Sequence, residues 1–298
     1  MRMTESDGTK NVIELQDVVK DYGDFQLDRV SFSVPEGSVC GFIGQNGAGK
    51  TTTINLILDI IARDSGEVKL FGESVGSDKA YLREDVGVVF DEMGFHDFMT
   101  GKDINLMMKN IYKNWDEAAY FDYLKRFSLP TRKACGAFSR GMRMKLQIAV
   151  ALSHHAKLLV MDEPTSGLDP IVRNEMIEIF RDFVVEEDHT ILLSSHITSD
   201  LEKIADEVVF IDGGRIVLQG NKDEILEKHG LLKCKKADLP KISDSLIVGV
   251  EEETYGATVC VNDRKAAQKL YPDMVLEPAA REEIMIYYVN AGRRDRSR

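Results

Sequence analysis

The sequence predicts an α/β protein built on a parallel-sheet core. Two observations carry this prediction. Short apolar runs of strand length alternate with helical stretches over residues 158–218, which is typical of parallel sheets covered by helices. Earlier in the chain, an apolar run at residues 39–43 leads through a glycine-rich turn into an apolar helix. We expect an antiparallel β subdomain before this core, a helical insertion within it and a small α+β appendage after it.

The N-terminal part predicts antiparallel strands and then a buried one. Residues 12–34 alternate apolar and polar side chains, with a break at Tyr22 and Gly23, which indicates two or three antiparallel strands. Residues 39–43 form a continuous apolar run typical of a buried parallel strand, and residues 50–62 continue as a helix.

The middle of the chain predicts helices and then strands again. Apolar residues recur at three- and four-residue spacing between residues 101 and 153, a pattern more typical of helix core than of a cofactor site. Strand-like runs return at residues 158–161, 191–194 and 208–211. Gly213 and Gly214 predict a hairpin into residues 216–218.

A change of pattern near residue 221 suggests a second unit. Residues 223–229 predict a helix, 246–250 and 257–261 short strands, and 281–289 a closing helix. We therefore divide the chain into a main domain over residues 1–221, with a helical subdomain at about 92–155, and a small accessory domain over residues 222–298.

Composition limits the function classes. The chain is 43% hydrophobic and 30% charged, and its net charge of −12 disfavours nucleic acid as a partner. Its apolar runs are far shorter than the roughly twenty residues of a membrane span, so a membrane role requires another chain. Residues 1–10 lack the apolar stretch of a secretory signal, which predicts a cytoplasmic location. The four cysteines form no CxxC pair, which argues against zinc and disulfides.

The glycine-rich turn fits the phosphate-binding pattern GxxxxGK[ST]. Glycines let backbone N–H groups curl around a phosphate, and the helix that follows directs its free N–H groups at the anion. Lys50 is expected to hold the β- and γ-phosphates, Thr51 to ligate Mg²⁺ and Thr52 to reach the α-phosphate. The residues expected to bind ATP in this turn are Gly44, Asn46, Gly47, Ala48, Gly49, Lys50, Thr51 and Thr52.

Two adjacent carboxylates, Asp162 and Glu163, end the apolar run at residues 158–161. Two buried acids without partners would be costly, so a nearby cation is a natural explanation. We expect Asp162 to hold Mg²⁺ through water and Glu163 to be the general base for the water that attacks the γ-phosphate. The alternative is a strand end with two solvated acids.

With both motifs, the chain resembles the ATP-binding subunits of ABC transporters, which implies the P-loop ABC ATPase fold. Residues 138–142, FSRGM, are similar to that family's LSGGQ signature, from which Arg140 and Met142 depart. Ser139 is a good helix N-cap. The resemblance implies that Ser139, Arg140, Gly141 and Met142 complete the site of a second subunit.

Further motifs follow the family's order. Ser166, Gly167, Leu168 and Asp169 are similar to its D-loop, which links the two sites of a dimer. His196 matches its switch histidine, expected near the γ-phosphate, although a lone histidine after a strand is more often structural. Tyr22 corresponds to the aromatic residue that stacks on adenine, with a packed strand tyrosine as the alternative.

Asp91 stands where the family usually has a glutamine. It follows the strand-like residues 86–90, in the loop that presents a ligand to Mg²⁺ and joins the core to the helical insertion. A one-residue slip would put Glu92 there instead. We expect Asp91 to contact Mg²⁺ and to make closure depend more steeply on the metal or on the membrane partner, or else to be a solvated loop acid.

The resemblance, over roughly residues 12–221, implies a function. The resemblance implies a subunit that hydrolyses ATP with Mg²⁺ and forms a homodimer. It also implies that this subunit powers an integral membrane permease at the cytoplasmic face of the membrane. FSRGM resembles bacterial ABC-2-type exporters of amphipathic or antimicrobial peptides. The alternatives are a non-transport ABC ATPase acting on nucleic acid or the ribosome, and a module that senses ATP without hydrolysing it. No long coiled-coil insertion or second cassette supports the former, and Glu163 argues against the latter.

Overall fold

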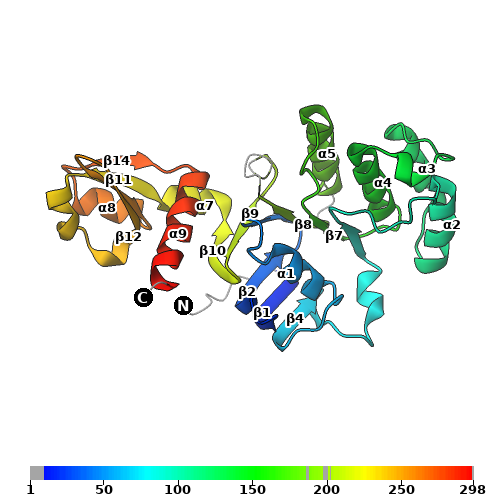
Figure 1. Ribbon diagram of the computed structural model, residues 1–298, viewed down its shortest axis with the longest axis horizontal. Coiled ribbons are helices and arrows are strands. Elements are labelled where there is room, and N and C mark those ends of the chain that lie inside the picture. The colour runs from blue at the N-terminus through cyan, green and yellow to red at the C-terminus, as the bar shows by residue number, and fades with distance from the viewer. Residues whose placement is uncertain (1–9, 186–187, 197–200, 202, 297–298) are drawn as a thin grey trace.

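A central sheet organises the chain (Figure 1). The structure is a computed structural model that describes residues 10–185, 188–196, 201 and 203–296. Within these residues six strands form the sheet in the order β10-β9-β3-β8-β7-β6, and all neighbours are parallel except β10 and β9. The strands are β3 (Val39–Ile43), β6 (Val86–Val89), β7 (Leu158–Asp162), β8 (Thr190–Ser195), β9 (Glu207–Asp212) and β10 (Arg215–Asn221). The predicted parallel-sheet core is confirmed.

An antiparallel sheet covers part of the core. In the described chain its order is β2-β1-β4-β5, and the break at Tyr22 and Gly23 separates β1 from β2 as predicted. Its strands are β1 (Asn11–Asp21), β2 (Gln26–Pro35), β4 (Ser65–Leu70) and β5 (Glu73–Ser74).

The helices lie beside these sheets, and α2 to α4 form the predicted insertion between β6 and β7. Helix α1 ends earlier than the predicted Ala62, because Asp59 adopts a left-handed conformation (φ 55°) and the Ile60 N–H bonds back to the Asn55 carbonyl. The helices are α1 (Lys50–Ile57), α2 (Gly101–Ile111), α3 (Glu117–Arg126), α4 (Arg140–Leu152) and α5 (Pro170–Phe183).

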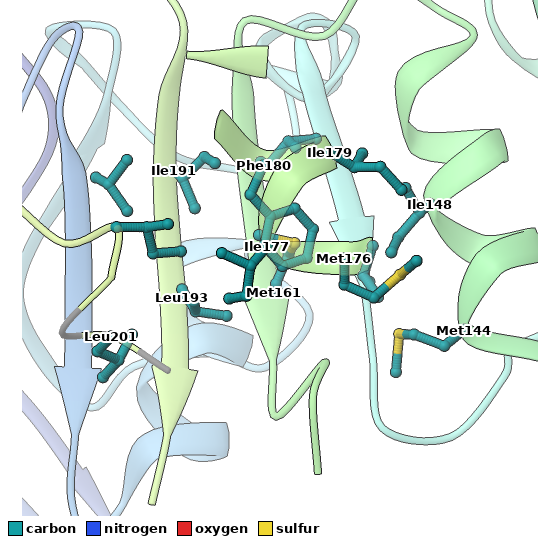
Figure 2. Packing of buried hydrophobic residues seen from close by; sticks show 14 of the residues in the cluster. Met144, Ile148, Met161, Met176, Ile177, Ile179, Phe180, Ile191, Leu193 and Leu201 are labelled. Carbon is teal, nitrogen blue, oxygen red and sulfur yellow. The ribbon is translucent and has the colours of Figure 1, made fainter. Parts of the chain in front are cut away.

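Alternation along the strands builds a core on each face of the central sheet. In β3, Val39 and Ile43 belong to one apolar cluster, and Cys40 and Phe42 belong to the other. Figure 2 shows the first cluster, in which Met144 and Ile148 of α4 and the side chains of α5 lie over Met161 of β7 and Leu193 of β8. The sheet is therefore buried on both faces between two apolar clusters.

The C-terminal part has a sheet of its own, but its last helix returns to the main core. In the residues described after β10, the sheet order is β12-β13-β11-β14. Ile284 and Tyr287 of the last helix belong to the same cluster as Phe210 of β9, and the helix lies between the small sheet and β10 (Figure 1). The division at residue 221 stays a prediction. The elements are α7 (Lys222–Lys228), β11 (Gly230–Cys234), β12 (Ile247–Glu252), β13 (Ala257–Val261), α8 (Arg264–Leu270), β14 (Val275–Pro278) and α9 (Arg281–Arg296).

Candidate active site

The glycine-rich turn lies between β3 and α1, as predicted. Gly47 and Gly49 have φ values of 79° and 111°, in the region that favours glycine. A Cβ on Gly49 would lie 2.5 Å from Cδ2 of Leu27, and one on Gly44 would lie 2.6 Å from the Ile211 carbonyl oxygen. The turn is therefore fixed by its glycines against β2 and β9.

A pocket of about 300 Å³ opens at this turn and brings together residues from distant motifs. Its polar lining combines backbone and side-chain donors with three carboxylates. The lining residues are Phe25, Gln45, Asn46, Gly47, Gly49, Lys50, Thr51, Thr52, Asp91, Asp162 and Glu163. Six of the eight turn residues predicted to bind ATP line it, Lys50 among them, while Gly44 and Ala48 are buried and do not.

Lys50 is buried and faces the acids. Its Nζ donates a hydrogen bond of 2.7 Å to the Gly44 carbonyl and lies 3.1 Å from Glu163 Oε1. The turn thus presents an ammonium group at the place where a phosphate would enter.

Asp162 is the last residue of β7, and two hydroxyl groups orient its carboxylate. Thr51 Oγ1 donates to Asp162 Oδ2 at 2.6 Å, and Ser194 Oγ of β8 donates to Oδ1. Mg²⁺ usually takes one or two carboxylates together with waters and phosphate oxygens. The pair Thr51 and Asp162 fits such an ion. Within the described residues no group of three or more His, Cys, Asp and Glu side chains could hold a metal, and this mode of binding needs none.

Glu163 lies where the chain leaves β7. Its backbone is left-handed (φ 52°), an unusual conformation for a non-glycine residue that is often found at functional sites. Its N–H donates to Ser194 Oγ at 3.0 Å, and its Oε2 lies 2.6 Å from Nδ1 of His196. The carboxylate is therefore held between Lys50 and His196, a position from which it can polarise a water molecule.

Ser194 is a site residue that was not predicted from the sequence. It supports both acids at once, since it donates to Asp162 and accepts from Glu163. Its only signal is its place at the end of a strand beside β7, which the sequence alone does not reveal.

Asp91 follows β6 and lines the pocket, whereas Glu92 lines a neighbouring cavity. Of the two residues proposed for the glutamine position, Asp91 alone lines this pocket, and its contact with Mg²⁺ stays a prediction. Its Oδ1 pairs with Nη2 of Arg140, so a cation inside the chain already balances its charge.

The signature residues lie at the start of α4, away from the pocket lining. Ser139 is the N-cap of α4 and accepts a hydrogen bond of 3.3 Å from the Met142 N–H, as predicted. Gly141 faces Val172 of α5, and Met142 packs against the main core. Their role toward a second subunit stays a prediction.

The D-loop residues join Glu163 to α5. Ser166 donates its N–H to the Glu163 carbonyl, Gly167 has a left-handed backbone (φ 66°), and Leu168 is buried. Asp169 caps α5 by accepting from the N–H groups of Ile171 and Val172. This capping is a structural task, and a link across a dimer stays a prediction.

Tyr22 lies outside the pocket lining and is 51% exposed, with Lys20 Nζ 5.6 Å from its ring centre. Phe25 lines the pocket instead and lies close to Gly49. Phe25 is not among the residues predicted from the sequence, although an aromatic residue two positions after Gly23 was a usable signal. Adenine stacking by Tyr22 stays a prediction.

A second cavity, of about 300 Å³, lies behind the turn and was not foreseen. Helix α9 forms one wall, and the other wall includes the switch residue His196. The lining residues are Ile43, Gly44, Gln45, His196, Phe210, Glu282, Met285, Ile286, Val289 and Asn290. The accessory part of the chain thus reaches the edge of the site.

Comparisons with known proteins agree with this geometry. The family model for ABC transporters matches residues 27–166. The chain is 36% identical over 221 residues to the bacitracin transport ATP-binding protein BcrA of Bacillus licheniformis, covering 73% of this chain and 72% of that protein. It is 33% identical over 230 residues to the Nod factor export ATP-binding protein I of Rhizobium sp. (strain N33), covering 74% of each. A solved ATP-binding subunit of an ABC transporter is similar with a TM-score of 0.65 at 27% identity, covering 72% of this chain and 91% of that one.

Proposed function

Since the chain belongs to the ATP-binding subunits of ABC transporters and is an ATPase, we propose that it hydrolyses MgATP as a homodimer and drives export through a separate membrane permease. The predicted family and fold are confirmed. The observation that carries the proposal is the convergence of Lys50, Asp162 and Glu163 around one pocket, with His196 on Glu163.

ATP binding rearranges the ion pair between Lys50 and Glu163. An incoming γ-phosphate carries more negative charge than a carboxylate and attracts the Lys50 ammonium away from Glu163 Oε1. Oε1 then becomes free to accept a proton from water, while His196 keeps Oε2 in place. Thr51 and Asp162 would hold Mg²⁺, which neutralises charge on the β- and γ-phosphates when bound.

Two copies of the chain complete two sites. Cassettes of this family dimerise and pair with membrane permease subunits. We assign Ser139 and Gly141 of one copy to the ATP of the other, because both stand at the N-terminus of α4, where free N–H groups and the helix dipole favour an anion.

We place the permease at a groove of about 470 Å³ that is lined by the segment after α1, by β6 and by the end of α2. Most of its lining residues are apolar, three are charged (Asp59, Arg83 and Glu84), and Ile60 and Ile111 are each 57% exposed. Exposed apolar side chains of this size favour an apolar partner segment. None of the helices in the described ranges is long and apolar enough to cross a membrane, and we place the chain on the cytoplasmic face through this contact.

The cargo class is an amphipathic or antimicrobial peptide. The signature FSRGM supports this class, and two relatives carry names for bacitracin transport and Nod factor export. Those names describe the relatives.

The test is an efflux assay in a deletion strain of the source organism. Strains carrying no copy, the wild-type chain or Glu163→Gln are loaded with a fluorescent amphipathic peptide. We expect retention without the chain, efflux with the wild type and retention with Glu163→Gln. Equal efflux from all three strains would contradict the proposal.

A further inference from the structure

Arg140 contacts two other motif segments of its own chain. It is the first residue of α4, and its Nη2 pairs with Asp91 Oδ1. Its guanidinium also lies over Gly167, where an added Cβ would come within 2.9 Å of Nη1 and 3.0 Å of Cζ. The signature, the loop after β6 and the D-loop therefore meet at one side chain.

Asp91 and Arg140 are both departures from the resembling family's usual residues, glutamine and glycine. Their charges are opposite, and they are 49 positions apart in the sequence. Without Arg140, the charge of the Asp91 carboxylate would be unbalanced in the phosphate pocket that it lines. Together they form a neutral pair, which indicates that the two departures serve one contact.

A second contact from the same face of α4 holds the preceding residue. Gln147 accepts from the Phe90 N–H at 3.2 Å and donates to its carbonyl at 3.0 Å. Arg140 and Gln147 are seven residues apart, so they project from the same face of the helix. Helix α4 thus contacts Phe90 through two hydrogen bonds and Asp91 through an ion pair.

Of these contacts, the ion pair between Arg140 and Asp91 is the weaker one. The Arg140 and Asp91 side chains are 47% and 50% exposed, and exposed pairs are weak. Asp91 also lines the phosphate pocket, so a γ-phosphate there repels its carboxylate. Arg140 stands between Ser139 and Gly141, and a phosphate presented to them by a second copy attracts its guanidinium.

We propose that Arg140 is a positioning residue that latches α4 to Asp91 in the free subunit, and that ATP opens this latch when two copies close. This proposal rests on the dimer of the proposed function. The latch biases the free subunit against closure, and nucleotide in both sites removes that bias. Gln147 keeps α4 attached to the core in both states.

The test uses Asp91→Asn, which keeps the side-chain shape and removes the charge. Its matched control is Asp182→Asn, which breaks the exposed pair of Arg126 and Asp182 (3.0 Å) between α3 and α5. In the nucleotide-free monomer, we expect hydrogen exchange over residues 140–147 to become about two- to fivefold faster in Asp91→Asn alone. The double variant Asp91→Arg with Arg140→Asp restores an ion pair, so its hydrogen-exchange rate over residues 140–147 should return toward the wild-type rate.

The second readout is dimerisation. In the Glu163→Gln background with MgATP, Asp91→Asn should lower the dimer Kd about two- to fivefold, because the latch opposes closure only in the free subunit. An unchanged exchange rate, or a dimer Kd that is unchanged or higher, would overturn the proposal. If none of the variants forms an ATP-dependent dimer, the proposed function fails, and the exchange rates of the monomers still decide whether the pair holds α4.

Discussion

Lys50 Nζ lies 3.1 Å from Glu163 Oε1, and both side chains are largely buried. The cation that would bind phosphate therefore holds the base that would activate water. A nucleotide that takes Lys50 also releases Glu163, so substrate binding and activation of the base become one event. The same arrangement keeps an unpaired carboxylate out of the buried site before ATP arrives.

Gly49→Ala should strongly weaken nucleotide binding. The φ of 111° is strained for alanine, and the new Cβ would lie 2.5 Å from Leu27 Cδ2 and 3.0 Å from Phe25 Cζ. The turn must shift to relieve this overlap, at a cost of about 1–3 kcal/mol in addition to the backbone strain. Isothermal titration with ATP measures the loss.

The matched control is Gly47→Ala, which shares the positive φ (79°) but places its Cβ in open space. It should lower the melting temperature slightly and still bind ATP more tightly than Gly49→Ala. Equal affinity of the two variants would show that close packing of Gly49 does not shape the turn.

Ser194→Ala should raise the Mg²⁺ concentration needed for hydrolysis about 10- to 100-fold, the usual effect of removing a residue that orients a metal ligand. The substitution removes the donor to Asp162 Oδ1. The control is Ser153→Ala, which removes another buried hydroxyl, bonded to Ala149 in α4, away from the site. The ATPase rate of each variant is measured as a function of Mg²⁺ concentration. Identical curves for Ser194→Ala and Ser153→Ala would count against a supporting role for Ser194.

His154→Phe should flatten the loss of stability in acid. Burial holds the pKa of His154 below its ordinary value of 6.5, although a bond to the Glu84 carbonyl opposes the shift. In the described chain Nε2 has no hydrogen-bond partner, so a second proton would be unsatisfied. The unfolded chain takes up that proton first, and the free energy of unfolding falls as the pH drops below 6.5.

Phenylalanine keeps the ring that stacks on Tyr112 (3.9 Å between centroids) and removes the titration. Urea unfolding between pH 7.5 and 5 should therefore give a smaller slope for His154→Phe, by at most about 1.4 kcal/mol per pH unit. The other titrating groups contribute equally to the slopes of the wild type and the variant, so their contributions cancel in the difference. Equal slopes would mean that the pKa of His154 is the same in the folded and the unfolded chain.

The sequence predicted the parts of the fold that depend on local pattern. The glycine turn, the strands beside it and the N-cap Ser139 follow from neighbouring residues, and each was found. Short strands such as Ser65–Leu70 and Gly230–Cys234 were missed because their pattern is too brief to separate from loops. The end of α1 depends on Asp59 adopting a left-handed conformation, which aspartate does only occasionally.

The parts of the site that were missed depend on contacts between distant segments. Phe25, Ser194 and Gln147 gain their places only when β2, β8 and α4 pack around the turn. The position of α9 beside His196 also follows from tertiary packing, since Ile284 is buried against the main core. The ion pair of Asp91 and Arg140 could not be predicted from the sequence, because the two residues are 49 positions apart and meet only through tertiary packing.

Glu163→Gln provides the most direct test of a shared ATP site built from two copies. The amide keeps the shape of the side chain and loses its basicity, so hydrolysis should fall about 10²–10⁴-fold while ATP still binds. Light scattering with MgATP should then give twice the 33.5 kDa mass of one chain, and half that value without nucleotide. A variant that stays monomeric with ATP and hydrolyses it at the wild-type rate would contradict the account.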